Sequence, residues 1–218
     1  TSDVSRMRHT AVIIALMTAG ESVFLLPFVL ARIFRPTLLD VFEITNLELG
    51  VAFSTYGVVA IAAYFAGGPL ADRYSARSLM STSLVATGLG GVVLATIPST
   101  GVMNVLWGVW GVTTILLFWS AMLRATREWG GDQAQGRAYG LLDGGRGLIG
   151  ALIASATVFL FAIMLPVDPA LASLEERTAA FTGVIWCFTG FTLFVAALVF
   201  IVLPEGSPQV NQEGGTRL

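Results

Sequence analysis

The sequence predicts an all-α membrane protein with six transmembrane helices, and two observations carry this prediction. Of the 218 residues, 55% are hydrophobic and only 12% are charged, whereas roughly 25% are charged in soluble domains. The mean hydropathy is +0.79. A soluble protein of this length could not bury the amount of apolar surface that such a value implies. Six apolar segments also approach or exceed the roughly 20 helical residues that cross a hydrocarbon core of about 30 Å.

The first predicted span follows a polar N-terminal segment and contains an acidic residue, Glu21. Residues 1–8 are polar, and an apolar segment then covers residues 10–33. A signal peptide is the alternative interpretation, but this segment is too long for one and contains Glu21 and Pro27. We therefore expect a membrane span, followed by a polar connection at residues 32–46.

Polar or charged connections separate the other spans. The link at residues 98–101 is a minimal turn without charge, whereas residues 124–137 are predicted to be a charged loop and residues 167–177 an acidic connection. Pro204 ends the last span, because proline cannot continue a helix. The chain thus divides into a six-helix bundle over residues 1–204 and a polar linker or tail over residues 205–218. The expected spans are residues 10–33, 47–69, 79–97, 102–123, 138–165 and 178–203.

The distribution of arginine predicts the orientation in the membrane. An even number of spans places both termini on one side, and loops on the cytoplasmic side carry an excess of basic residues. Eight arginines fall on the side of the termini and three on the other, so we expect both termini in the cytoplasm. The first set is Arg6, Arg8, Arg73, Arg77, Arg124, Arg127, Arg137 and Arg217; the second is Arg32, Arg35 and Arg177.

The link between the second and third spans carries a recognisable motif. It reads Gly68-Pro69-Leu70-Ala71-Asp72-Arg73-Tyr74-Ser75-Ala76-Arg77. Charges this close together must sit in a turn at the membrane surface, because each would cost several kcal/mol at the bilayer centre. Gly68, Leu70, Asp72, Arg73 and Arg77 fit the pattern G-x-L-x-D-R-x-G-R-[KR], which major facilitator superfamily transporters carry between their second and third helices. Ser75 replaces the usual second glycine and Ala76 an expected base. The chain resembles the N-terminal six-helix half of such a transporter.

This resemblance implies a fold and a mechanism. Members of the family have twelve spans in two halves, and each half is a three-plus-three inverted repeat. The resemblance implies a secondary transporter, with symport among the modes, that moves a small solute by alternating access across a bacterial plasma (inner) membrane. We favour an organic anion as the solute. A second six-helix half, absent from this chain, or self-association would complete it.

The same resemblance assigns a gating role to the motif. In the family the counterpart of Asp72 docks near a helix N-terminus of the second half and holds the cytoplasmic side shut. A carboxylate in that position gains roughly 0.3–2 kcal/mol. Arg77 is expected to pair with Asp72, and Gly68 to let neighbouring helices approach. The alternative is a capped turn with snorkelling arginines.

Three charged residues inside the spans are candidates for solute or proton binding. Glu21 lies near the middle of the first span, and an ionisable residue at that depth indicates function by default. Asp143 and Arg146 lie three residues apart in the glycine-rich segment 140–150, so they share one helix face and can neutralise each other. The guanidinium of Arg146 suits a carboxylate or phosphate. By helical rise, Glu21 and Arg146 lie about 17 Å and 10 Å from the cytoplasmic boundary. Structural hydrogen bonds or a structural ion pair are the alternatives.

Aromatic and hydroxyl side chains supply further candidates for the cavity. Trp110, Thr113 and Thr114 lie on the fourth span, with Trp119 beyond them, and Tyr56 lies on the second span. In the family the fourth helix lines the cavity, and such groups suit a polar organic solute. Trp107, nearer the external end, is expected to anchor the membrane interface.

The composition argues against several other classes of protein. Cys187 and His9 are the only residues of their types. The chain therefore has too few cysteine and histidine side chains for a zinc, haem or Ser-His-Asp site. We expect no catalytic residue, no metal, no cofactor and no nucleic-acid partner, and hence no enzyme. The alternative function is a six-helix structural or assembly subunit without transport of its own.

Overall fold

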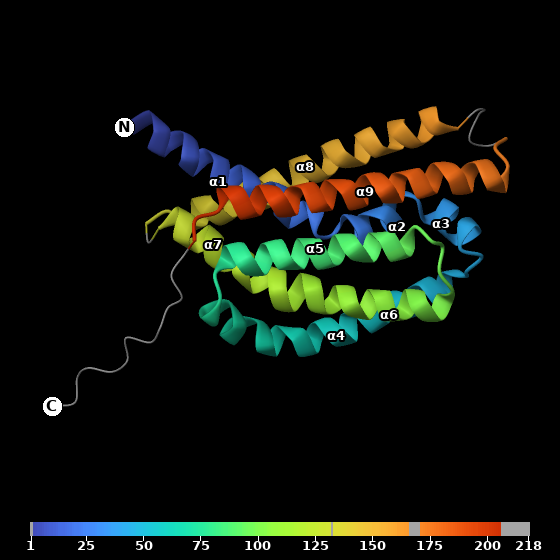
Figure 1. Cartoon of the computed structure of the whole chain (residues 1–218), viewed down its shortest axis with the longest axis horizontal. Helices are drawn as coiled ribbons and strands as arrows, with labels where there is room; N and C mark the ends of the chain where they lie inside the picture. The colour runs from blue at the N-terminus through green and yellow to red at the C-terminus, as the bar shows by residue number, and fades with distance from the viewer. Residues whose placement is uncertain (1, 132, 166–170, 206–218) are drawn as a thin grey trace.

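Six helical spans run side by side along the long axis of the bundle (Figure 1), as the sequence predicts. The computed structural model describes residues 2–131, 133–165 and 171–205, and within them the regular structure is entirely helical. The elements are α1 (Ser2–Ser22), η1 (Leu25–Val29), α2 (Leu30–Ile33), α3 (Arg35–Val41), α4 (Asn46–Arg73), α5 (Ala76–Leu94), α6 (Thr100–Gly111), η2 (Val112–Trp119), α7 (Ser120–Gly130), α8 (Gln135–Met164) and α9 (Leu174–Val202).

The first and fourth spans are each built from three pieces with a π-helical turn in the middle. The first consists of α1, η1 and α2, and the fourth of α6, η2 and α7. Pro27 lies in η1 and has no N–H to give to the helical ladder, which explains the irregular turn there. In η2 the hydroxyl of Thr114 donates to the carbonyl oxygen of Trp110 at 2.7 Å. That bond competes for an acceptor of the backbone ladder.

The packing of the spans follows a three-plus-three repeat. The first span packs through α1 against α8 and α9, which are the last two spans of the second triplet. The fourth span packs through α6 and η2 against α4, and through η2 against α5, which are the last two spans of the first triplet. Exchanging the first span with the fourth, the second with the fifth and the third with the sixth converts one set of contacts into the other. The remaining large contact, between α5 and α9, maps onto itself. The predicted fold class is therefore confirmed.

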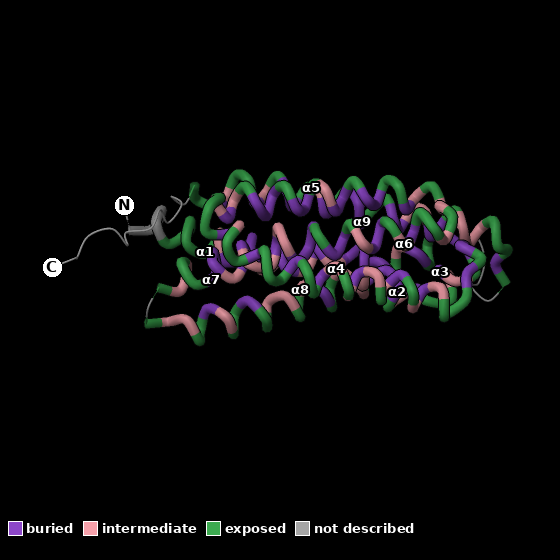
Figure 2. Tube along the Cα trace, turned by 90° about the horizontal axis from the view of Figure 1, so that it is seen from below, coloured by how far each residue is buried: buried purple, intermediate pink, exposed green. Residues whose placement is uncertain are grey.

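Two spans remain largely uncovered. In their most apolar stretches only 28% of the residues of α4 and 17% of those of α8 are buried, against 44% to 61% in the other four spans. The tube coloured by burial shows long exposed edges on both helices (Figure 2). Large apolar side chains such as Val58, Phe65, Leu152 and Phe159 project from these faces, which suits lipid or another membrane helix.

The ends of the helices differ from the prediction in several places. The connection at residues 32–46 contains α3, which begins with Pro36 in its first turn and buries Leu38 and Val41. The motif is mostly helical, because α4 continues to Arg73, and only residues 74 and 75 link it to α5. Ser75 caps α5 by accepting a hydrogen bond from the N–H of Ser78 at 3.2 Å.

Two further expectations are wrong. Residues 124–137 are not simply a charged loop, because α7 continues to Gly130 and ends at Gly131 with a φ of 62°. Trp107 is not an interface anchor: it is fully buried and packs edge-on against Trp110, with ring centroids 4.7 Å apart. Residues 166–170 of the predicted acidic connection and 206–218 of the predicted tail lie outside the described residues.

One end of the bundle carries the start of α1, the α4–α5 link, the end of α7 and the end of α9 (Figure 1). We call it the motif end. His9, Ala76, Trp129 and Leu203 line one common cavity there of about 440 Å³, so segments far apart in the sequence meet at this end.

Candidate functional site

The interface between α1 and α8 brings Glu21 and Arg146 together through two glycines. A Cβ atom at Gly150 would lie 2.6 Å from Oε1 of Glu21, so the Glu21 carboxylate rests directly on the α8 backbone. A Cβ atom at Gly20 would lie 2.7 Å from Cδ of Arg146, so the arginine stem rests on α1. Each charged side chain thus occupies the space that a glycine leaves on the opposite helix, next to the other charged residue. We call these four residues the interlock.

Glu21 lies on the open stripe of α1. Met17, Glu21, Phe24 and Phe28 are each partly exposed, at spacings of three or four residues, while the residues between them are mostly buried. This spacing marks one face of a helix. Within the described chain, Glu21 and Arg146 are not in direct ion-pair contact.

Arg146 is held mainly by an acid and by two rings. It forms the ion pair with Asp143 that the three-residue spacing predicts, with Nη1 3.5 Å from Oδ1. Its guanidinium carbon lies 5.9 Å from the centroid of Phe24 and 5.5 Å from that of Trp119, within the range of cation–π attraction. Its Nε is buried and has no hydrogen-bond acceptor in the structure. This N–H lies against Gly20 of α1 and forms no hydrogen bond in this state of the protein.

A row of aromatic rings continues from Arg146 along the same face. The ring of Phe24 lies 6.2 Å from Trp119 and 6.2 Å from Phe28, and Phe28 stacks on Phe53 at 5.5 Å. All four side chains are partly exposed. Phe24 precedes η1, Phe28 lies in η1, Trp119 lies in η2 and Phe53 lies in α4. Among them, only Trp119 was predicted from the sequence to lie in the cavity. A signal was present in the phenylalanines at positions 24 and 28, which share the helix face of Glu21.

The predicted hydroxyl candidates lie inside the bundle and bond to one another. Tyr56 is 2.7 Å from the hydroxyl of Thr114, which donates its proton to the carbonyl oxygen of Trp110. The hydroxyls of Thr113 and Thr87 are 2.8 Å apart. Trp110 and Thr114 are fully buried, and Tyr56 and Thr113 are 8% and 5% exposed. In this state of the protein these groups tie α4, α5 and the fourth span together.

The motif residues lie at the motif end, on α4 and α5. Gly68, Asp72 and Arg73 are exposed, and Leu70 and Arg77 are partly exposed. The guanidinium of Arg77 lies 4.0 Å from the ring centroid of Phe200 and, among the described residues, is not ion-paired with Asp72. A side chain at Gly68 would meet no atom within 4 Å, whereas one at Gly67 would approach the Ser120 hydroxyl to 2.8 Å. Of these two glycines, Gly67 and not Gly68 lets a neighbouring helix approach closely within this chain.

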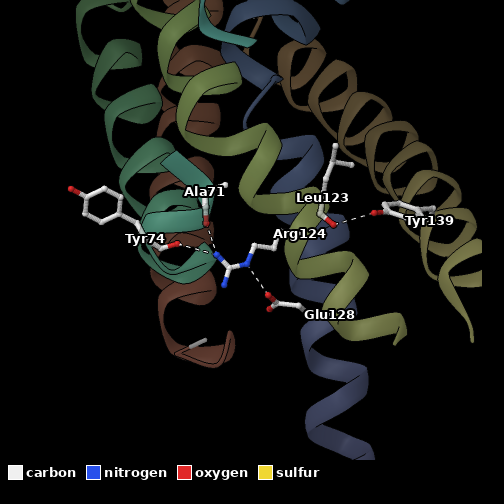
Figure 3. A network of polar contacts seen from close by, with 6 residues as sticks. All are labelled: Ala71, Tyr74, Leu123, Arg124, Glu128 and Tyr139. Atoms are coloured by element: carbon white, nitrogen blue, oxygen red, sulfur yellow. Dashed lines mark hydrogen bonds and ion pairs between the residues drawn. The ribbon is translucent and has the colours of Figure 1, made fainter. Parts of the chain in front are cut away.

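Arg124, which the sequence analysis assigned to a loop, fastens the end of α4. It is 8% exposed, and Nη1 donates to the carbonyl oxygens of Ala71 and, at 3.5 Å, Tyr74 (Figure 3). Its Nε donates to Glu128 at 2.7 Å. A cation at the C-terminal end of a helix satisfies carbonyl oxygens that lack intrahelical partners. The four-residue spacing of Arg124 and Glu128 was the available signal.

Two more contacts join α7 to its neighbours at the motif end. The hydroxyl of Tyr139 on α8 donates to the carbonyl oxygen of Leu123 at 3.2 Å (Figure 3). The indole of Trp129 donates to the carbonyl oxygen of His9 at 2.8 Å and stacks on its imidazole with centroids 4.4 Å apart. The end of α7 thus connects α1, α4 and α8. Among the described residues, no three His, Cys, Asp or Glu side chains gather to hold a metal.

Comparisons with known proteins agree with this architecture. The sequence profile of the family described as "Major Facilitator Superfamily" matches residues 10–218. The chain is similar to "Inner membrane protein YihN" of Escherichia coli (strain K12), 28% identical over 204 residues, which are 92% of this chain and 46% of that protein. It is also similar to "Inner membrane protein YqcE" of the same organism, 34% identical over 124 residues, or 57% of this chain and 29% of that protein. The chain spans about half the length, or less, of these relatives.

Proposed function

The chain belongs to the major facilitator superfamily, and from this premise we propose that it forms the first six-helix half of a secondary transporter for a small organic anion. Membership of that family makes it an integral membrane protein and supports a transporter over an enzyme or a structural subunit. The match to YihN covers 46% of that protein, so YihN is about twice as long as the matching region, which supports a second six-helix half as the partner. Transport then proceeds by alternating access around a site between the halves.

The interlock is the observation that carries this proposal. Glu21 and Arg146 are the ionisable residues that face each other from α1 and α8, on the partly exposed side of both helices. Arg146 holds the anionic group of the solute, because its guanidinium offers parallel donors and its contact with Asp143, at 3.5 Å, is long enough for a solute carboxylate to compete. Glu21 takes up the coupling proton. When the site is empty, the two attract each other and keep it closed, and the solute competes with Glu21 for Arg146.

The motif and the uncovered helices serve the other half in this proposal. The exposed faces of α4 and α8 pack against it, and Asp72 latches the cytoplasmic side by docking at one of its helix N-termini. Asp72 is exposed at the last turn of α4 and has no ion pair in the described part of the chain, so it is available for such a contact. Both termini face the cytoplasm, the membrane is a bacterial inner membrane, and residues 205–218 belong to the linker between the halves.

Two substitutions in the protein carrying both halves test the roles of the interlock. Arg146→Lys keeps the charge and loses the planar fork, so it weakens solute binding far more than a charge argument implies. Glu21→Gln leaves binding measurable and abolishes accumulation driven by a pH gradient. Arg127→Lys, on an exposed arginine of α7, is the matched control and changes neither. If Arg146→Lys binds normally and Glu21→Gln still concentrates solute, both side chains are structural and the assignment fails.

A further inference from the structure

The face that carries the interlock is aromatic well beyond Arg146. Phe24, Phe28, Phe53 and Trp119 form a connected row, with neighbouring centroids 5.5 to 6.2 Å apart. These spacings are those of stabilising ring pairs, which lie roughly 4.5–7 Å apart. On the proposed function, we infer that the transported anion has a flat, apolar body, an aromatic carboxylate being the type that fits, and that this body lies against the row while its carboxylate meets Arg146.

The row of rings begins beside Arg146. This position determines where the carboxylate and the apolar body of the solute lie. The guanidinium of Arg146 lies 5.9 Å from the ring of Phe24 and 5.5 Å from the ring of Trp119. A carboxylate that draws the guanidinium toward itself therefore arrives beside these two rings. Any group attached to that carboxylate extends along Phe28 and Phe53, because these are the next members of the row. Partial exposure of all four rings leaves apolar surface for it to cover.

The polar groups of the same spans argue against a hydroxylated solute. The hydroxyls of Tyr56, Thr113 and Thr114 are buried and already bonded to one another or to the carbonyl oxygen of Trp110. On the open stripe of α1, the hydroxyl of Thr18 donates to the carbonyl oxygen of Ile14 at 2.8 Å. A sugar acid would find few free partners here, and burying its hydroxyls without partners is costly. An apolar ring needs none.

Four small probes separate the effect of charge from the effect of shape. Benzoate has the charge and the flat ring, cyclohexanecarboxylate has the charge and a puckered ring, gluconate has the charge and hydroxyls, and benzyl alcohol has the ring alone. Their affinities for the full-length protein in phospholipid nanodiscs are measured by isothermal titration calorimetry. We expect benzoate to bind most tightly and gluconate and benzyl alcohol to bind at least 10-fold more weakly.

Ring-removing substitutions locate the effect. Phe24→Leu and Phe53→Leu keep an apolar side chain and should weaken benzoate about 2- to 13-fold, the value of an aromatic contact. Gluconate should bind unchanged in Phe53→Leu, because only Phe24 of these two rings also lies against the guanidinium of Arg146. Phe159→Leu, at a ring on α8 that is 67% exposed and outside the row, is the matched control. Trp119→Phe keeps a ring and should bind benzoate nearly as well as the wild type, even if the leucine variants fold poorly.

The outcomes distinguish this inference from the proposed function. If benzoate and gluconate bind equally and both depend on Arg146, the anion site stands and the aromatic solute is wrong. If no carboxylate binding depends on Arg146, the site itself is wrong and the inference falls with it. Preference for benzoate that is lost in Phe24→Leu and Phe53→Leu, and kept in Phe159→Leu, supports both.

Discussion

Replacing Gly150 by alanine tests the interlock with the smallest change that the structure allows. The added Cβ atom would lie 2.6 Å from Oε1 of Glu21 and 2.9 Å from its Cδ, whereas ordinary contacts begin at 3.4 Å. The carboxylate must therefore retreat by about 0.8 Å. Because it is the far end of a flexible side chain, Glu21 moves and the α8 backbone stays, so the protein still folds.

The expected loss is in function and not in stability. A misplacement of about 1 Å in a reacting group can cost roughly 100-fold in rate, so we expect uptake driven by a pH gradient to fall about 10- to 100-fold. Gly147→Ala is the matched control, since a Cβ atom there meets nothing within 4 Å. Both alanines favour the helix by about 1 kcal/mol over glycine, so the two variants should melt at similar temperatures.

A double substitution makes the reasoning refutable. If Gly150→Ala acts by displacing Glu21, it should have no further effect in a protein that already carries Glu21→Gln, because effects on one shared contact are not additive. Since Glu21→Gln abolishes uptake driven by a pH gradient, this comparison is read as downhill uptake of solute, which needs no gradient of protons. Equal transport by Gly150→Ala and Gly147→Ala, or an undiminished effect of Gly150→Ala in the Glu21→Gln protein, would refute it.

Three further predictions concern the motif end and the orientation. Arg124→Met removes charge-assisted bonds to the end of α4, worth about 1.5–3 kcal/mol each, and should lower the melting temperature measured by circular dichroism; the exposed Arg127→Met should change stability by no more than about 0.5 kcal/mol, and equal melting would contradict the role. In a cysteine-free protein, an impermeant thiol reagent applied outside intact cells should label Leu171→Cys and spare Gln133→Cys, both exposed positions, and the reverse pattern would overturn the topology. Asp72→Asn, in the protein with both halves, should raise the inward-open population about 1.7- to 30-fold, read as accessibility of cytoplasmic cavity positions, and unchanged accessibility would reduce Asp72 to a helix-end residue.

The six spans could be predicted from the sequence because each is a long apolar run, and a bilayer sorts residues by hydropathy alone. Their ends could not. A charged residue was taken as the start of a loop at position 124, yet Arg124 is buried. Its partners are carbonyl oxygens of Ala71 and Tyr74, about fifty residues earlier in the chain. No local pattern reports an acceptor that only tertiary packing brings near.

In the candidate site, too, some features could be predicted from the sequence and others depend on tertiary packing. Glu21 and Arg146 could be singled out because charges inside membrane spans are rare. Thr114 and Tyr56 were chosen for their chemistry, but a sequence does not say whether a hydroxyl faces a cavity or another helix, and here the two face each other. The pairing of Gly150 with Glu21 depends on the relative height of α1 and α8, which depth counting along each helix estimates only within several ångströms.

The contact between Arg146 and Trp119 also gives the protein an intrinsic optical reporter. An indole changes its emission when a nearby charge moves, and the guanidinium of Arg146 lies 5.5 Å from the Trp119 ring centroid. Trp107 and Trp110 are fully buried and so supply a steady background, while Trp129 and Trp186, which is 49% exposed, are replaced by phenylalanine to remove their emission. Any ligand that draws the arginine away from Trp119 is therefore recorded as a change in fluorescence, without a label and without knowledge of what the ligand is.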